Sequence, residues 1–133
     1  MTPVDLHGTL DDRGLLDDSH GAGVYALALD VPDSVEAVQR RRLAVAESPW
    51  PDDMAEQFAA AERVVYVGES GDVYDRLMDH ARGDVRRAAL VAAYPIVDVV
   101  GVWPGERSAT AERDRARALA SASTAAYANG ELF

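Results

Sequence analysis

The pattern of hydrophobic and polar positions is clearest in the middle of the chain. Val64 to Val67 are β-branched or aromatic residues, which predicts a short strand. Gly68 is expected to end this strand. Ser70 or Asp72 can then cap a helix that stops at Gly83. The segment therefore predicts a strand, a turn and a helix.

Apolar residues of this helix recur at the spacing of one face, which is formed by Val73, Leu77, Met78 and Ala81. Arg76 and His80 are one turn apart and flank that face. One edge of the helix is thus expected to present a permanent cation and a titratable imidazole beyond the end of the strand.

The remaining pattern predicts further strands and helices around this segment. Residues 1 to 20 lack clear periodicity and are expected to form a loop, in which His7 and His20 are solvated. The other expected elements are a central strand at 22–31, helices at about 35–47 and 53–62, a helix at 84–93, a valine-rich strand at 95–103 and an alanine-rich helix at about 109–126. The predicted fold class is α/β (α+β), with a small three-stranded mixed or antiparallel sheet flanked by helices.

The length of 133 residues is typical of one domain with a core of its own. We divide the chain into an acidic leader at 1–21 and a domain at 22–133 that carries a helical insertion at about 33–62. The sequence contains no cysteine and no apolar run of membrane-spanning length. We therefore expect no membrane partner and a cytoplasmic location.

The chain carries a formal net charge of −10, and all 13 of its basic residues are arginines. Residues 1–33 contain seven aspartates and one arginine, so the leader is more acidic than the rest. An acidic surface favours solubility, and the leader could alternatively mask a binding face. Nucleic-acid enzymes usually present basic surface instead.

Two tripeptides and four later residues resemble the GIY-YIG nuclease family. Gly23-Val24-Tyr25 is similar to the first half of the name motif, and Tyr66-Val67-Gly68 to the second. The family places its two motifs on adjacent strands joined by a short loop, whereas about 40 residues separate them here. The resemblance covers roughly residues 22–130. The catalytic residues that it implies are Tyr25, Tyr66, Arg76, His80, Glu112 and Asn129.

The resemblance also implies chemistry for these positions. Arg76 would balance charge on a phosphate, because its guanidinium is always protonated and can donate two hydrogen bonds. Glu112 would hold a single divalent metal, Mg²⁺ or Mn²⁺. Tyr25 or Tyr66 would orient or deprotonate water with help from His80, since an ordinary tyrosine is a poor base at neutral pH. Asn129 would hold an oxygen atom in place.

Glu112 shares one stripe of the last predicted helix with Ala116 and Leu119, which suggests that it points inward. A buried carboxylate needs a partner, which could be an arginine such as Arg76 or a metal ion. The two strand tyrosines, Tyr25 and Tyr66, could likewise be core residues with hydroxyls at the rim. Tyr74, Tyr94 and Tyr127 are expected to be packing residues.

Two groups of arginines could contact phosphate. Arg40, Arg41 and Arg42 form the densest basic run, and Arg82, Arg86 and Arg87 cluster after the central helix. The run could instead be a solvated helix face. The leading function is a metal-dependent endonuclease acting on DNA, and the rival is a nucleic-acid-binding or regulatory domain without turnover. The insertion could also bind a protein partner or a second copy of the chain.

Overall fold

The computed structural model describes residues 1–83 and 88–133, and it has an α+β fold. The helices are α1 (Pro3–Asp12), α2 (Leu16–Ser19), α3 (Val35–Leu43), α4 (Asp52–Ala60), α5 (Val73–Arg82), α6 (Ala89–Ala93) and α7 (Ala109–Leu119). The strands are β1 (Gly23–Leu29), β2 (Arg63–Ser70), β3 (Ile96–Pro104), β4 (Thr124–Ala128) and β5 (Glu131–Leu132).

The strands form one mixed sheet in the order β3-β1-β2-β4-β5. Strand β1 pairs antiparallel with both β2 and β3, β4 lies parallel to β2, and β5 returns antiparallel to β4. All residues of β1 are buried, as its apolar sequence predicts for a central strand. The expected three-stranded sheet is correct for β1, β2 and β3 but is too small, because β4 and β5 extend it.

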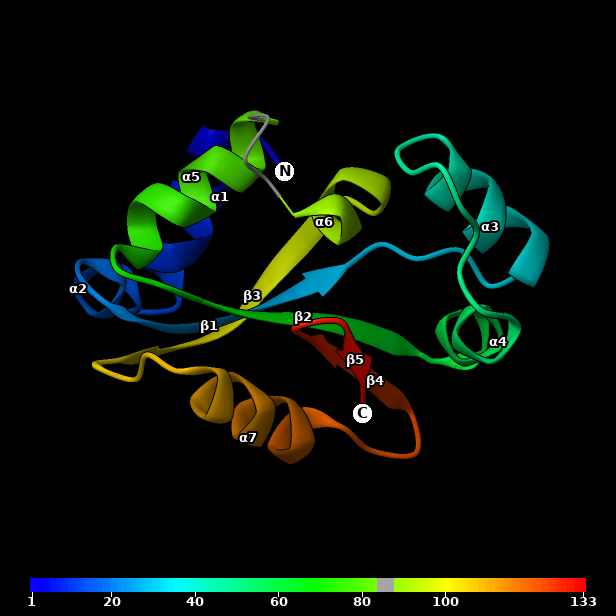
Figure 1. Cartoon of the computed structure of the whole chain (residues 1–133). Helices are drawn as coiled ribbons and strands as arrows, with labels where there is room; N and C mark the ends of the chain where they lie inside the picture. The colour runs from blue at the N-terminus through cyan, green and yellow to red at the C-terminus, as the bar shows by residue number, and fades with distance from the viewer. Residues whose placement is uncertain (84–87) are drawn as a thin grey trace.

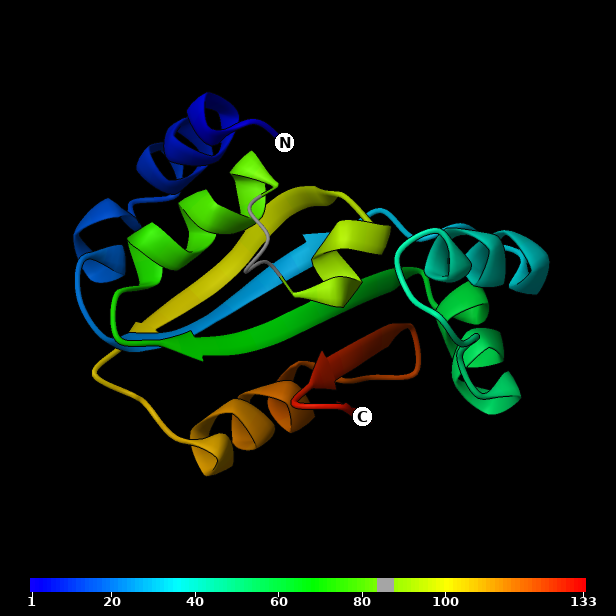
Figure 2. The same cartoon turned by 45° about the horizontal axis from the view of Figure 1, so that its top comes forward.

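The sheet is the middle of three layers (Figure 1). Helices α1, α5 and α6 lie on one face, and α7 covers the other. Helices α3 and α4 pack together at one end of the sheet (Figure 2). Alternate residues of each central strand therefore face either α5 or α7.

The expectation of a loop at residues 1–20 is wrong. Thr2 begins α1 through a capping box with Asp5, and Pro3 occupies the first turn. Leu6 and Leu10, one turn apart, are fully buried in the main core. The start of the acidic leader is therefore a packed helix with an acidic outer face.

The insertion is helical as expected, but it is more than a surface addition to the sheet. The main core cluster includes Val38 of α3, Phe58 of α4 and Trp50, which precedes α4. The buried Tyr94 links these helices to the segment after α6, since its hydroxyl donates to the Val38 carbonyl at 2.8 Å and accepts from Trp50 Nε1 at 3.1 Å. Tyr94 is thus a packing residue with a structural hydrogen-bonding role.

The alanine-rich segment after residue 119 is not helical. Helix α7 ends at Leu119, and the Ser121 hydroxyl accepts hydrogen bonds from the backbone of Ser123 and Thr124 in the turn that follows. Ala125, Ala126 and Ala128 then lie in β4 beside β2. High helix propensity is overridden here by pairing with a distant strand. The helix expected at 84–93 is described only from Ala89 to Ala93, and its first four residues lie outside the described part.

No helix within residues 1–83 or 88–133 is long and apolar enough to cross a membrane.

Replacing Tyr94 with Phe should lower the free energy of unfolding by about 1–3 kcal/mol, because Trp50 Nε1 loses its acceptor inside the core. The matched control is Tyr74→Phe. The Tyr74 hydroxyl contacts His7 Nδ1 at an exposed position, so this change should cost roughly 0.5 kcal/mol or less. Urea unfolding of both variants measures the difference, and equal stabilities would contradict the role given to Tyr94.

Candidate active site

Tyr25 projects from the middle of the sheet toward α5 and is almost completely buried, at 1% exposure. Its partner across the strands is Gly68. A β-carbon at position 68 would lie only 2.5 Å from the Tyr25 hydroxyl, so glycine supplies the space for the ring. Gly68 was expected to end the strand, but β2 continues through it to Ser70. Its function is to admit Tyr25 rather than to break β2.

Helix α5 brings His80 to this hydroxyl. Asp72 caps the helix by accepting from the Asp75 backbone, and Gly83 ends it in the left-handed conformation with φ 74°. Both ends agree with the sequence-based prediction. His80 is buried beside the apolar face, and a 2.9 Å hydrogen bond joins its Nε2 atom to the Tyr25 hydroxyl.

Tyr66 and Arg76 complete the cluster on this face. The Tyr66 ring centroid is 6.2 Å from that of Tyr25 and 6.0 Å from that of His80. Tyr25 forms side-chain hydrogen bonds with both Tyr66 and Arg76. The two strands therefore pair across the insertion, and the two tyrosines, the arginine and the histidine lie in one cluster.

Burial raises the pKa of Tyr25 well above its usual range, and the neighbouring Tyr66 raises it further, while Arg76 partly opposes both effects. Burial also raises the pKa of Tyr66; hydrogen bonding to Tyr25 and the Arg76 charge oppose this, and Glu112 adds to it. Both hydroxyls are therefore protonated at neutral pH. They can hold and orient a water molecule, but neither can remove its proton without a second group.

Glu112 lies on α7, on the opposite face of the sheet, and is half-buried. Burial raises its pKa, and the negative charge of Glu69 raises it further. Within the described residues Glu112 forms no ion pair, so an arginine partner such as Arg76 is not observed. Glu69 is paired with Arg107 at 3.2 Å. Two carboxylates therefore lie close together beneath the end of β2.

The two faces of the site meet at one edge of the sheet. Strand β4 pairs with β2 only from Arg63 to Val67, so no described strand covers the outer edge of residues 68–70. Asn129 follows β4 directly, with φ 50°, and Gly130, with φ 82°, completes the tight turn into β5. Asn129 lines a cavity of about 220 Å³ together with Tyr66. Its amide is exposed near the cluster rather than part of it.

The basic residues predicted to contact phosphate do not form one patch. Arg40 pairs with Glu36 at 3.6 Å in solvent. Arg41 lies over the Tyr94 ring at 5.6 Å, and Arg42 lies over the Trp50 ring at 3.9 Å. Among the described members of the two groups, only Arg42 lines the cavity that includes Tyr66. Arg82 pairs with Asp79 at 3.7 Å, and Arg86 and Arg87 lie outside the described residues.

Sequence reasoning missed three residues beside the cluster: Glu69, Trp50 and Tyr127. Glu69 follows Val65 and Val67 at strand spacing, which places it on the α7 face, but this is visible only if β2 continues beyond Gly68. Tyr127 is the register partner of Tyr66 on β4. No local signal for this partnership exists, because the two residues are far apart in sequence.

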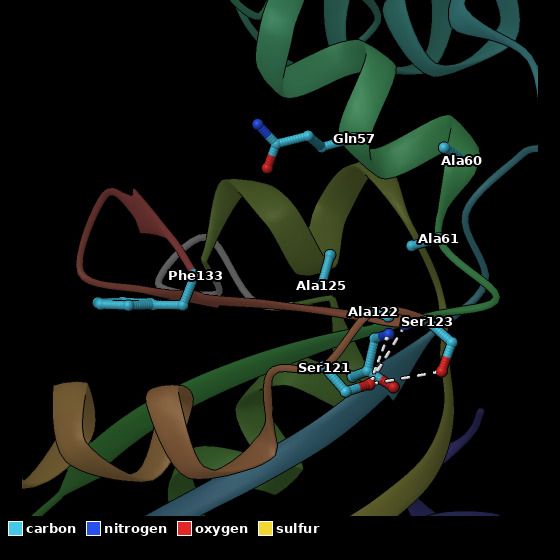
Figure 3. A pocket seen from close by; sticks show the side chains of 9 residues that line it. Gln57, Ala60, Ala61, Ser121, Ala122, Ser123, Ala125 and Phe133 are labelled. Atoms are coloured by element: carbon cyan, nitrogen blue, oxygen red, sulfur yellow. Dashed lines mark hydrogen bonds between the residues drawn. The ribbon is translucent and has the colours of Figure 1, made fainter.

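A second hollow lies between the end of α4 and the turn before β4 (Figure 3). It has a volume of about 180 Å³, and Ser121 and Ser123 on its wall are hydrogen-bonded to each other. Its lining residues are glutamine, alanine, serine, threonine and phenylalanine, so no titratable side chain borders it. The tyrosine cluster is therefore the better candidate for chemistry.

Comparison of the chain with protein-family models, with curated proteins and with solved structures gave no match.

Gly68→Ala should destabilise the fold by more than 1 kcal/mol, on the scale of overpacking in a filled core, because Tyr25 must move away from His80. Gly8→Ala is the matched control. Gly8 lies within α1 with no neighbouring atom within 4 Å of an added β-carbon, so the change should stabilise the protein by about 0.5–1 kcal/mol. Chemical denaturation measures the change in the free energy of unfolding, which should be negative for Gly68→Ala and positive for Gly8→Ala. Two changes of equal sign and size would contradict the proposed function of Gly68.

The raised pKa of Glu112 predicts a pH-dependent effect of Glu112→Gln in metal-free buffer. At pH values between the ordinary pKa of 4.5 and the raised pKa of Glu112, the folded protein binds more protons than the unfolded chain. The stability of the fold therefore falls as the pH rises and Glu112 ionises. The variant should therefore melt at a higher temperature than the wild type at pH 7. The advantage should vanish below pH 4.5.

Glu106→Gln is the control of opposite sign. Arg115 donates two hydrogen bonds to Glu106, at 2.9 and 2.7 Å, and lowers the pKa of that carboxyl. Ionised Glu106 therefore stabilises the folded state at pH values above the ordinary pKa of 4.5, and this stabilisation is lost as the pH falls. The control should melt at a lower temperature than the wild type at pH 7. Thermal melts across pH that show the same sign for both variants would refute the assignment.

Proposed function

We propose that this protein is a metal-dependent endonuclease that hydrolyses DNA phosphodiester bonds and resembles the GIY-YIG nucleases. The observation that carries the proposal is the convergence of Tyr25, Tyr66, Arg76 and His80. These residues come from β1, β2 and α5, and about 40 residues, which include the insertion, separate the first two. A structural role alone does not require an arginine, an imidazole and two hydroxyls at one point of a core.

Arg76 supplies the charge that a phosphodiester requires. Its guanidinium is hydrogen-bonded to the Tyr25 hydroxyl, its side chain is only partly buried, and a guanidinium carries five N–H donors in a fixed plane. Charge-assisted hydrogen bonds of this kind strengthen as negative charge develops on the transferring phosphate. Arg76 therefore stabilises the transition state.

The burial of the tyrosines suggests different functions for them. Tyr25 is buried and bonded to His80, whereas Tyr66 is partly exposed and lines the cavity at the sheet edge. Tyr66 is therefore the hydroxyl that contacts the attacking water. Tyr25 links Tyr66 to His80, whose imidazole is the proton acceptor that two protonated tyrosines need.

The chemistry of the two carboxylates fits a divalent cation. Glu112 and Glu69 bring negative charges together at a half-buried place, and hard cations such as Mg²⁺ and Mn²⁺ prefer carboxylate oxygens. Glu112 would hold the ion with Glu69 as a second oxygen donor. When bound, the ion would polarise the phosphate and stabilise the leaving alkoxide. The described residues contain no group of three His, Asp or Glu side chains placed to hold a metal ion, so water and the phosphate would complete the coordination.

A second candidate is a nucleic-acid-binding or regulatory domain without turnover. The net charge of −10 counts against the nuclease, because so acidic a chain has little electrostatic attraction for a polyanion, and a regulatory domain does not need that attraction. Both candidates use the same surface. A cleavage assay with divalent metal on plasmid, branched and single-stranded DNA, across salt concentrations, distinguishes them.

Arg76→Ala and Glu112→Gln should each lower the single-turnover cleavage rate by at least about a hundredfold, the scale for removing one key electrostatic group. Unfolding free energies should change by far less than the ~3–5 kcal/mol expected for a broken buried ion pair. Added Mg²⁺ should stabilise the wild type by mass action and leave the Glu112 variant unchanged.

Arg113→Ala is the matched control on α7, since Arg113 pairs with Glu131 at 3.6 Å on the exposed surface. It should cleave at the wild-type rate. If the wild type shows no metal-dependent cleavage while all three variants remain folded, the binding domain without turnover is the better assignment.

A further inference from the structure

The cavity beside Tyr66 has aromatic walls, and we name it the aromatic pocket. Its volume is about 220 Å³, and its wall includes Tyr66, Tyr127, Trp50, Arg42 and Asn129. Tyr66 also belongs to the catalytic cluster. Any group held in the aromatic pocket is therefore next to the proposed reacting phosphate.

The aromatic walls are fixed by the surrounding structure. Tyr127 is the register partner of Tyr66, and their rings are 6.4 Å apart at an interplanar angle of 26°. Trp50 packs edge-on against Tyr127 at 5.9 Å. The Trp50 backbone donates to the Gln39 side chain at 2.8 Å, and its indole donates to Tyr94. These contacts hold the aromatic rings of the pocket in defined positions.

The size and the chemistry of the aromatic pocket select its occupant. Sites for whole small molecules usually span about 300–1,000 Å³, so this smaller volume suits a single heterocycle. Tyrosine rings stack on any base, because every base has a π-face. Arg42 and the Asn129 amide add donors at the rim, where the edge of a base or its phosphate would lie.

We propose that the aromatic pocket holds one unstacked nucleobase, stacked on Tyr127, from a single strand or an unpaired position in DNA. The inference rests on the proposed nuclease function and specifies its substrate class. Binding of the base would position the adjoining phosphate beside Tyr66 and Arg76. A fully paired duplex must first expel a base from its stack, so it would be the poorer substrate.

Trp50 provides a direct readout. The chain contains two tryptophans, and the Trp103→Phe change leaves Trp50 as the only one. With Glu112→Gln added and EDTA present, a thymidine hexamer should quench the emission of Trp50. A hexamer of abasic residues should bind about fivefold to a hundredfold more weakly, the range for losing one base–aromatic stack. A blunt duplex should give little quenching.

The second arm changes the pocket. Tyr127→Ala should weaken hexamer binding by the same factor, whereas Tyr127→Phe keeps the ring and should bind as the unaltered protein does. Tyr74→Ala removes a tyrosine ring from α5 at a distance from the pocket and should leave binding unchanged.

Equal binding and quenching by the thymidine and abasic hexamers would overturn the inference. Cleavage of a paired duplex by the wild type as fast as of a single strand would do the same. Base-dependent quenching in the Trp50-only variant, together with a wild type that cleaves no DNA, would uphold the pocket and refute the proposed nuclease activity.

Discussion

The space above Gly68 is the constraint on which the centre of this protein depends. A tyrosine ring fills it, and a buried hydroxyl there must find a partner. His80 of α5 is one partner, and Arg76, one turn earlier on the same helix, is another. Together with the buried apolar residues of α5, these hydrogen bonds hold the helix against the sheet. The same contacts therefore pack the core and position the side chains of the candidate site.

The insertion lengthens the connection between β1 and β2 without disturbing their pairing. The entropy cost of closing a loop grows only slowly with its length, and Val38, Trp50 and Phe58 recover free energy by burial in the main core. Tyr94 then ties α3 and Trp50 to the segment after α6. The result is a wall of the site, since Trp50 packs against Tyr127 and carries Arg42 on its face.

Local signals made the central elements predictable. The strand β2 is predictable from its β-branched residues, and α5 from its cap at Asp72 and its end at Gly83. These two elements carry most of the cluster around Tyr25. The capping box from Thr2 to Asp5 is an equally local signal for α1.

Strand β4 is different: its alanines favour helix, and its pairing with β2 is non-local, so no window of sequence reports it. Glu69 is hard to predict for a related reason: Gly68 favours the end of a strand, and only the space that Tyr25 needs explains why β2 continues through it. The three consecutive arginines of α3 diverge because successive helix positions point about 100° apart.

In the proposed nuclease, the position where β4 stops would let a phosphate reach both Arg76 and the two carboxylates. Arg76 lies on the α5 face and the two carboxylates on the α7 face, separated by the sheet itself. They can act together only around an edge that carries no further strand. The Asn129–Gly130 turn, with both φ angles positive, ends β4 opposite Val67 and leaves that edge of residues 68–70 uncovered. A longer β4 would cover it and divide the site in two. The contribution of Asn129 is thus first to the backbone: it ends β4 opposite Val67, where the proposed nuclease would need an opening for its substrate, and its exposed amide lies beside that edge as a consequence.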